Sequence, residues 1–263
     1  MRIRRSRSRS WTPRKRCTGK RSTSSTRSRR SNRWGCKTQA RLLDLGRRSY
    51  KEIWDLQRSI HAAVASGEAP DTWIVVEHEP VVTLGRQGKT ANVIVPREAL
   101  AARGVELYEI ERGGDVTYHG PGQVVVYPIL KLPRFREVVP LVRKLEEAVL
   151  GVCRRYGIEG ERWREHAGVW VGTNCMCAIG LAVQKMTSLH GIALNASTEL
   201  DYDRLINPCG LTDRGITSLS REMGRTVSYD EAKDVLLQEL DAIFDLGISA
   251  GPSTSRLAAL RSG

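Results

Sequence analysis

The sequence of 263 residues predicts a single α/β or α+β domain in which helices flank a mixed β-sheet. Short β-branched segments outnumber helical ones in the middle of the chain, and amphipathic helices lie on either side of them. The chain is also 40% hydrophobic, which is enough for one substantial core, and it is too short for two ordinary domains plus tails. We therefore expect one folded body over residues 41–250, without an internal repeat or linker.

Three segments have the apolar spacing of amphipathic helices. The first is Tyr50–Ala65, with Ser49 as a plausible N-cap and Gly67 as the residue that stops it. Pro140–Tyr156 has apolar side chains on one side and charged ones on the other. Ser228–Phe244 closes the body as a helix capped by its serine.

Between these helices, short runs rich in β-branched residues predict strands. A glycine-rich stretch, residues 112–123, interrupts them and is expected to be a loop between two strands. The expected strands are Trp73–His78, Val81–Leu84, Leu107–Glu111, Gln123–Tyr127, Gly168–Val171, Cys177–Val183 and Leu189–Asn195.

The net charge of +13 belongs to one end of the chain. Residues 1–40 contain 12 Arg, 3 Lys and 8 Ser but no acidic residue. Residues 41–263 hold the other 27 of the 42 basic side chains against all 29 acidic ones, so their net charge is −2. A basic surface of the kind that binds nucleic acid is therefore not expected on the folded body.

Residues 1–40 have too few aliphatic side chains to offset the entropy of ordering, so we expect a disordered tail. Three interpretations stay open: an organelle transit peptide, upstream sequence joined through a wrongly chosen start codon, or an arm that binds RNA or another polyanion. Residues 251–263 are expected to form a flexible C-terminal tail. We expect a cytoplasmic protein, or a mitochondrial or plastid one if the tail is a transit peptide.

The apolar runs and the cysteines indicate whether the protein enters a membrane and in which redox compartment it works. The longest apolar run, Val124–Leu130, is much shorter than the roughly 18 residues that span a bilayer, so no membrane partner is expected. The six cysteines have no paired spacing and no secretory signal precedes them. Free thiols in a reducing compartment are therefore expected, and we expect a monomer.

The most distinctive stretch of the sequence is Arg112–Gln123. Four glycines and a proline let backbone N–H groups approach a ligand closely, while Arg112, Tyr118 and His119 supply polar groups. A turn-rich connection is the simpler interpretation of the glycines alone. Because Arg112, Tyr118 and His119 occur together in one short loop, we favour a loop that lines a binding or catalytic site.

Two further stretches hold candidate groups. Leu189–Asn195 is an apolar strand with His190 and Asn195 near its ends, which fits either a site or a buried strand with a satisfied histidine. Asn207–Gly210 places Cys209 in a Pro/Gly turn. Although most cysteines are small core residues, one held at a rigid turn is a good nucleophile candidate.

With these residues the chain resembles the lipoyl(octanoyl) transferases over about residues 41–245. The motifs occur in the order and near the spacing of that family, and the loop with the RGG-x-VTYHGPGQ pattern is the most specific of them. The matching motifs are Glu77–Gly85, Arg112–Gln123, Gly168–Val171, Ala178–Gly180, His190–Asn195, Pro208–Gly210 and Thr217–Leu219.

The resemblance implies the fold of the lipoate and biotin ligase catalytic domain, in which a mixed sheet and helices enclose an acyl-binding tunnel. It implies that Cys209 forms an acyl thioester and that residues 41–250 are an octanoyltransferase catalytic domain. The substrate-binding residues that it implies are Arg112, Gly113, Gly114, Asp115, Val116, Thr117, Tyr118, His119, Ala178, Ile179, Gly180, Gly191, Ile192 and Ala193.

The implied reaction has two steps. Cys209 takes an octanoyl group from octanoyl-acyl carrier protein, and a lipoyl-domain lysine then takes it as a stable amide. The implied acceptors are the lipoyl domains of 2-oxoacid dehydrogenase E2 subunits and the glycine-cleavage H protein. Thioester exchange is nearly balanced and amide formation is downhill, so no ATP and no other cofactor is expected.

The sequence departs from this family at one position. The family has a lysine five residues before the glycine of its A-I-G motif, where it lowers the cysteine pKa and shuttles the proton, and this chain has Cys175. Lys185 is ten residues away, about 33 Å along a straight strand, which is too far to replace it. His190 and His119 are candidate bases, and we favour His190.

Other interpretations follow from the same residues. The chain fits a catalytically impaired family member, an ATP-dependent lipoate or biotin ligase, or a silent binding protein. Strand alternation would place Cys175 and Cys177 on one face, where they could join Cys209 or a histidine in a metal site. We nevertheless expect no metal.

Overall fold

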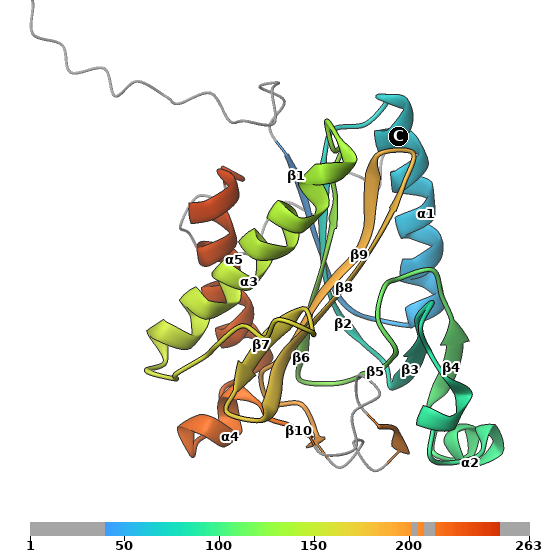
Figure 1. The fold of residues 1–263 in the computed structure, drawn as a ribbon, viewed down its shortest axis with the longest axis vertical. Coiled ribbons are helices and arrows are strands. Elements are labelled where there is room, and N and C mark those ends of the chain that lie inside the picture. The colour runs from blue at the N-terminus through green and yellow to red at the C-terminus, as the bar shows by residue number, and fades with distance from the viewer. Residues whose placement is uncertain (1–39, 201–204, 208–213, 248–263) are drawn as a thin grey trace, which may run out of the picture. The chain divides into compact units, whose positions relative to one another are not determined.

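A seven-stranded mixed sheet forms the centre of the protein (Figure 1). The structure, a computed structural model, describes residues 40–200, 205–207 and 214–247. The strands run in the order β1-β2-β6-β9-β8-β10, and β7 also pairs with β8. Their bounds are β1 (Arg41–Arg48), β2 (Thr72–His78), β6 (Gln123–Ile129), β7 (Gly168–Val171), β8 (Asn174–Gln184), β9 (Thr187–Asn195) and β10 (Gly215–Ile216).

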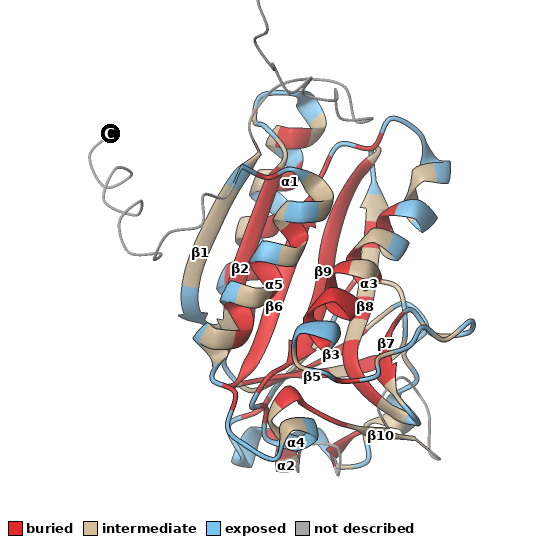
Figure 2. Cartoon of the chain, turned by 90° about the vertical axis from the view of Figure 1, so that its left-hand side faces the viewer, coloured by how far each residue is buried: buried red, intermediate tan, exposed pale blue. Residues whose placement is uncertain are grey.

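The inner strands of this sheet are buried on both faces. Figure 2 shows β2, β6 and β9 almost wholly buried, whereas the edge strand β1 is largely intermediate or exposed. β1 runs parallel to β2 and β10 runs parallel to β8, while all the other pairs in the sheet are antiparallel. Burial on both faces explains why the inner strands read as continuous apolar runs.

Helix α1 (Tyr50–Ser66) covers one face of the sheet. Ser49 caps it by accepting a hydrogen bond from the Glu52 backbone N–H, and Gly67 ends it in the left-handed conformation, with φ +85°. Its apolar stripe, which includes Ile53, packs against Val76, Val125 and other side chains of β2 and β6.

Helices α3 (Val138–Arg155) and α5 (Tyr229–Phe244) cover the opposite face (Figure 1). Side chains at helical spacing on α3, such as Leu141 and Leu145, meet Leu236 and Leu240 of α5 in the largest hydrophobic cluster. Trp73 of β2 is buried in the same cluster and contacts the Phe244 ring edge-on.

A second, three-stranded sheet packs beside the first. Its order is β4-β3-β5, with β3 parallel to β4 and antiparallel to β5. The remaining bounds are β3 (Val81–Leu84), β4 (Glu106–Glu109), β5 (Val116–His119), α2 (Arg97–Ala102), α4 (Leu219–Met223) and the short 3₁₀ helices η1 (Thr90–Asn92) and η2 (Phe135–Glu137).

The fold class predicted from the sequence is confirmed, and so are the three long helices with the serine caps expected for two of them. One expectation was wrong: residues 112–123 are not a single loop, because Val116–His119 forms β5 and pairs with β3. The sequence analysis also missed β1, β10, α2 and α4. The predicted tails, apart from residue 40 at the start of the structure, lie outside the described residues.

In the part of the chain that the structure describes, no helix combines the length and the apolar composition that crossing a membrane requires.

Candidate active site

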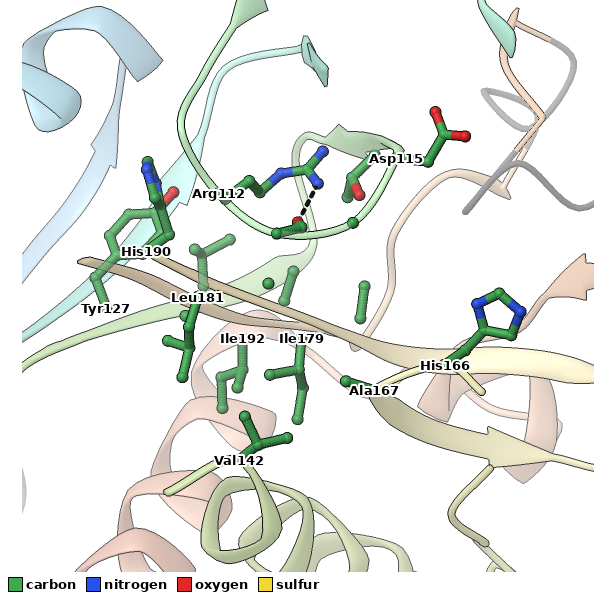
Figure 3. A pocket seen from close by; sticks show the side chains of 18 of the residues that line it. Arg112, Asp115, Tyr127, Val142, His166, Ala167, Ile179, Leu181, His190 and Ile192 are labelled. Atoms are coloured by element: carbon green, nitrogen blue, oxygen red, sulfur yellow. Dashed lines mark hydrogen bonds between the residues drawn. The ribbon is translucent and has the colours of Figure 1, made fainter. Parts of the chain in front are cut away.

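A cavity of about 550 Å³ surrounds the middle of the β8–β9 hairpin (Figure 3). It is bounded by the glycine loop of residues 112–115, by the start of α3 and by the loop that precedes β7. Of the predicted substrate-binding residues, the lining includes Arg112, Gly113, Gly114, Asp115, Thr117, His119, Ala178, Ile179, Gly180, Gly191, Ile192 and Ala193. Val116 and Tyr118 instead line a second, smaller cavity.

One wall of the large cavity carries almost no side chains. In the β8–β9 register Ala178 lies opposite Ala193, and Gly180 lies opposite Gly191. Ala193 packs with the side chains of α1, so Ala178 opposite it lies on the face that α1 covers, and so does Gly180 two residues further along β8. Their small size leaves a strip of bare backbone, which we call the channel floor.

The glycine loop crosses above this floor. The Gly113 N–H donates a hydrogen bond of 2.9 Å to the Leu181 carbonyl, which fixes the loop to β8. A Cβ atom on Gly180 would lie 3.0 Å from the Gly113 carbonyl oxygen, closer than ordinary contacts allow. The loop therefore requires glycine at position 180.

Arg112 holds the loop rather than projecting freely into the cavity. Its buried guanidinium donates to the Thr83 carbonyl at 2.6 Å and to Thr83 Oγ1 at 2.9 Å. A third bond of 3.0 Å reaches the Gly113 carbonyl. The sequence predicted a ligand-anchoring arginine, and the described contacts make it an anchor for the loop itself.

Asp115 ties the same loop to a neighbouring segment. Its carboxylate accepts hydrogen bonds from Asn92 Nδ2 at 2.6 Å and from the Lys89 backbone N–H at 3.2 Å. The Asn92 carbonyl in turn accepts from the Asn207 N–H at 2.8 Å. This chain of contacts links the cavity to the residues just before Cys209, which itself lies outside the described residues.

Cys175 lines the second cavity, a hollow of about 40 Å³. The two cavities share the lining residues Thr117, Ala178 and Ala193, so they lie side by side. Ile206 and Ile216 also line the hollow.

A β-bulge directs Cys175 toward this hollow. In the β7–β8 pairing Val169 lies opposite Cys177 but Trp170 lies opposite Cys175, so Met176 is the extra residue. Cys177 and Met176 pack in the core with α3, while Cys175 lines the hollow on the other side. The expectation that Cys175 and Cys177 share a face was wrong, because strict alternation fails at a bulge.

A chain of hydrogen bonds runs from His119 to the backbone of Cys175. His119 Nδ1 lies 2.7 Å from Gln123 Oε1, and Gln123 Nε2 donates to Asn195 Oδ1 at 2.9 Å. Asn195 Nδ2 then donates to the Thr217 carbonyl, and the Thr217 N–H donates to the Cys175 carbonyl, each at 3.0 Å. Burial lowers the pKa of His119 to about 3, so its ring is neutral at pH 7.

His190 lies at the other end of the floor. It pairs with Leu181, six residues along β8 from Cys175, which corresponds to about 20 Å of strand. Lys185 is farther still, in the turn that joins β8 to β9. Of the two candidate bases, His119 therefore has the closer connection to position 175, although the sequence favoured His190.

The sequence analysis missed several polar and aromatic residues around the cavity. Tyr50 and Tyr127 line it, and the Tyr50 ring is stacked on the His119 ring at 6.1 Å. His78 Nε2 lies 2.8 Å from the Tyr127 hydroxyl. The available signal was a polar group on an otherwise apolar surface, namely Tyr127 in an apolar strand and Gln57 on the buried face of α1.

The chain belongs to the family of the lipoyl protein ligase A/B catalytic domain, whose model matches residues 49–241. Curated octanoyltransferases are similar to it over most of its length. The Chloroflexus aggregans octanoyltransferase is 43% identical over 206 residues, 77% of this chain and 93% of that protein. The Roseiflexus sp. octanoyltransferase is 42% identical over 223 residues, 82% of this chain and 93% of that protein. The resemblance found in the sequence is thus confirmed.

Solved structures agree on the fold. A lipoate-protein ligase A bound with ATP has a TM-score of 0.65 at 17% identity, covering 79% of this chain and 86% of that one. A bi-partite lipoate protein ligase from Thermoplasma acidophilum has a TM-score of 0.62 at 17% identity, covering 79% and 84%. At this identity the likeness concerns the fold alone.

Buried histidines near the cavity predict that acid destabilises the protein. Burial lowers the pKa of His78 to about 4 from the ordinary 6.5. Between pH 7 and pH 5 the unfolded chain gains a proton there that the folded chain does not, so His78 alone should remove about 2 kcal/mol of stability. Urea unfolding of the natural chain and of His78→Gln at both pH values measures this.

We expect His78→Gln to lose about 2 kcal/mol less stability than the natural chain on this acidification. Equal losses in the two proteins would contradict the assignment of His78 as a buried neutral group.

Proposed function

We propose that this protein transfers an octanoyl group from acyl carrier protein to a lysine of lipoyl domains, through a thioester on Cys209. The observation that carries the proposal is the channel floor, a strip without large side chains in a chain that is 43% identical to an octanoyltransferase. The floor gives an acyl chain a surface to lie on, and the glycine loop, which contacts β8 at Gly180, gives it a side wall.

The dimensions of the floor support an eight-carbon substrate. From Ala178 to Leu181 the strand advances three residues, about 10 Å. An extended octanoyl chain is about 9 Å long, from seven carbon–carbon bonds of about 1.5 Å in a zigzag. A chain whose thioester lies near Thr117 and Ala178 would therefore end beside His190.

Cys209 is the proposed acyl carrier because its sequence neighbours bracket the small hollow. Ile206 and Ile216 line that hollow, which lies beside the proposed acyl cavity. The Cys209 thiolate attacks the thioester carbonyl of the donor and expels the carrier thiolate. The lysine amine then attacks the enzyme thioester, forms the amide and releases the Cys209 thiol.

Ionisation of the Cys209 thiol is the step of the proposed reaction that the described residues assist least. A thiol with an ordinary pKa is only a few per cent ionised at pH 7, so a nearby positive charge would help. Cys175 carries none, and neutral His119 supplies none at pH 7. We infer that acylation in this chain is slower than it would be with lysine at position 175.

The partners follow from the reaction. We propose octanoyl-acyl carrier protein as the donor, and the lipoyl domains of 2-oxoacid dehydrogenase E2 subunits and the glycine-cleavage H protein as acceptors. The family and its relatives support acyl carriers and lipoyl domains in general. A cytoplasmic location is proposed, or an organelle if residues 1–40 are a transit peptide.

Covalent loading tests the proposed function directly. Incubation with octanoyl-acyl carrier protein should add one octanoyl group to the intact protein, cleavable by hydroxylamine because it is a thioester. Mass spectrometry measures the adduct, and Cys209→Ser should abolish it. Absence of the adduct, together with pyrophosphate release from ATP and free lipoate, would instead identify a ligase.

Restoring the positive charge should raise the rate. We expect Cys175→Lys to accelerate octanoyl transfer by about 10²–10⁴-fold, the usual worth of general acid–base assistance. Single-turnover kinetics with octanoyl-acyl carrier protein measure the change. Cys175→Met, which adds a side chain of similar length without a charge, is the matched control and should give no gain. Equal rates for the two variants would show that position 175 does not handle the proton.

A further inference from the structure

A cluster of buried polar groups closes the far end of the channel floor. His190 lines the cavity and is only 2% exposed, and Gln57 of α1 lies behind it with 0% exposure. The His190 backbone N–H donates to Gln57 Oε1 at 3.0 Å, which holds the two residues together. Figure 3 shows His190 beside Tyr127, on the opposite side of the cavity from Asp115 and His166.

The hydrogen-bonding capacity of this cluster is unused. Among the described residues, neither ring nitrogen of His190 has a hydrogen-bond partner, and neither does Gln57 Nε2. The Glu111 carboxylate lies 3.7 Å from His190 Nε2, which is too long for a hydrogen bond. Buried polar atoms are usually paired, because an unpaired one has lost its hydrogen bonds to water without replacement.

His190 also has a strained backbone. Its φ is +58°, a left-handed conformation that non-glycine residues rarely adopt. Regular alternation would place its side chain on the same face as Ile192, which packs in the core with α3. Instead the ring lies on the channel side, with its centroid 6.4 Å from that of Tyr127.

Strain and unpaired polar atoms at one residue favour a binding role over a structural one. A neutral imidazole has one donor and one acceptor nitrogen, so it can bond a hydroxyl group in either direction. Burial lowers the pKa of His190, which keeps the ring neutral at pH 7. The ring thus matches a small uncharged hydrogen-bonding group at the end of the acyl channel.

We propose that His190, held in place by Gln57, forms a polar terminal subsite, which accepts a hydroxyl group at the far end of an eight-carbon chain and excludes longer apolar chains. The inference rests on the proposed function, because it assumes that the acyl chain lies along the channel floor. An octanoyl chain of about 9 Å fills the floor of about 10 Å up to this subsite. Two more methylene groups would press apolar surface against groups that need hydrogen bonds.

Binding of three carboxylic acids to the natural chain tests the subsite without relying on catalysis. Octanoate, 8-hydroxyoctanoate and decanoate share the same head group, so differences in Kd by calorimetry report the far end of the chain. We expect 8-hydroxyoctanoate to bind no more weakly than octanoate. Decanoate should bind about tenfold more weakly, since it leaves buried polar atoms covered by methylene groups.

His190→Gly removes the ring and suits the positive φ. It should bring decanoate within about threefold of octanoate and weaken 8-hydroxyoctanoate about tenfold relative to octanoate. Lys185→Gly is the matched control, because Lys185 also has a positive φ, of 47°, in the same hairpin but does not line the cavity. It should keep the selectivity of the natural chain.

Two outcomes would overturn the subsite. One is a natural chain that rejects 8-hydroxyoctanoate about tenfold relative to octanoate, and the other is a His190→Gly variant with unchanged selectivity. In both cases octanoate still binds, so the proposed acyl transfer is unaffected. Failure of all three acids to bind would instead contradict the assignment of the cavity as the acyl site, and the subsite with it.

Discussion

The close contact between the glycine loop and β8 is the constraint on which the site depends. One backbone hydrogen bond of 2.9 Å, from Gly113 to Leu181, fixes the loop above the large sheet. The Arg112 guanidinium binds Thr83 and so ties the loop to the small sheet. This contact requires Gly180, and together with the other small residues of the floor it leaves the space that forms the cavity.

Two chains of hydrogen bonds extend from the small sheet toward the region of the proposed nucleophile. One passes from Asp115 through Asn92 to Asn207, and the other passes from His119 to the Cys175 backbone. The first chain ends at Asn207, which follows the hollow-lining Ile206, and the second ends at Cys175, which lines the hollow itself. Cys175 is the position at which the family resemblance implies a lysine, and we propose that its lack of charge slows proton transfer without disturbing the fold.

Much of the fold was predictable from local patterns. The helix of Tyr50–Ala65 carries its own start and stop signals in Ser49 and Gly67, and the apolar runs of the inner strands are unambiguous. The assignment of strands to sheets was not predictable, because β2 and β3 are separated by only Glu79 and Pro80 yet join different sheets. Pairing of that kind depends on contacts far apart in the sequence.

The candidate site was likewise predictable from the sequence only in part. The motifs named many of the residues that line the two cavities, because glycines and polar residues within apolar strands are visible in the sequence. The bulge at Met176 and the left-handed backbone of His190 were not visible, since both break the alternation on which strand predictions rely. These two irregularities decide which way Cys175 and His190 point.

The central claim is that an acyl chain lies beside the glycine loop, over the small residues of β9. A crystal structure of the protein soaked with octanoate tests it most directly. The account predicts continuous density over Ala193 and Gly191, alongside Gly113, with the chain end beside His190. Density on the other side of the hairpin, against Val138 and Val142 of α3, would contradict it.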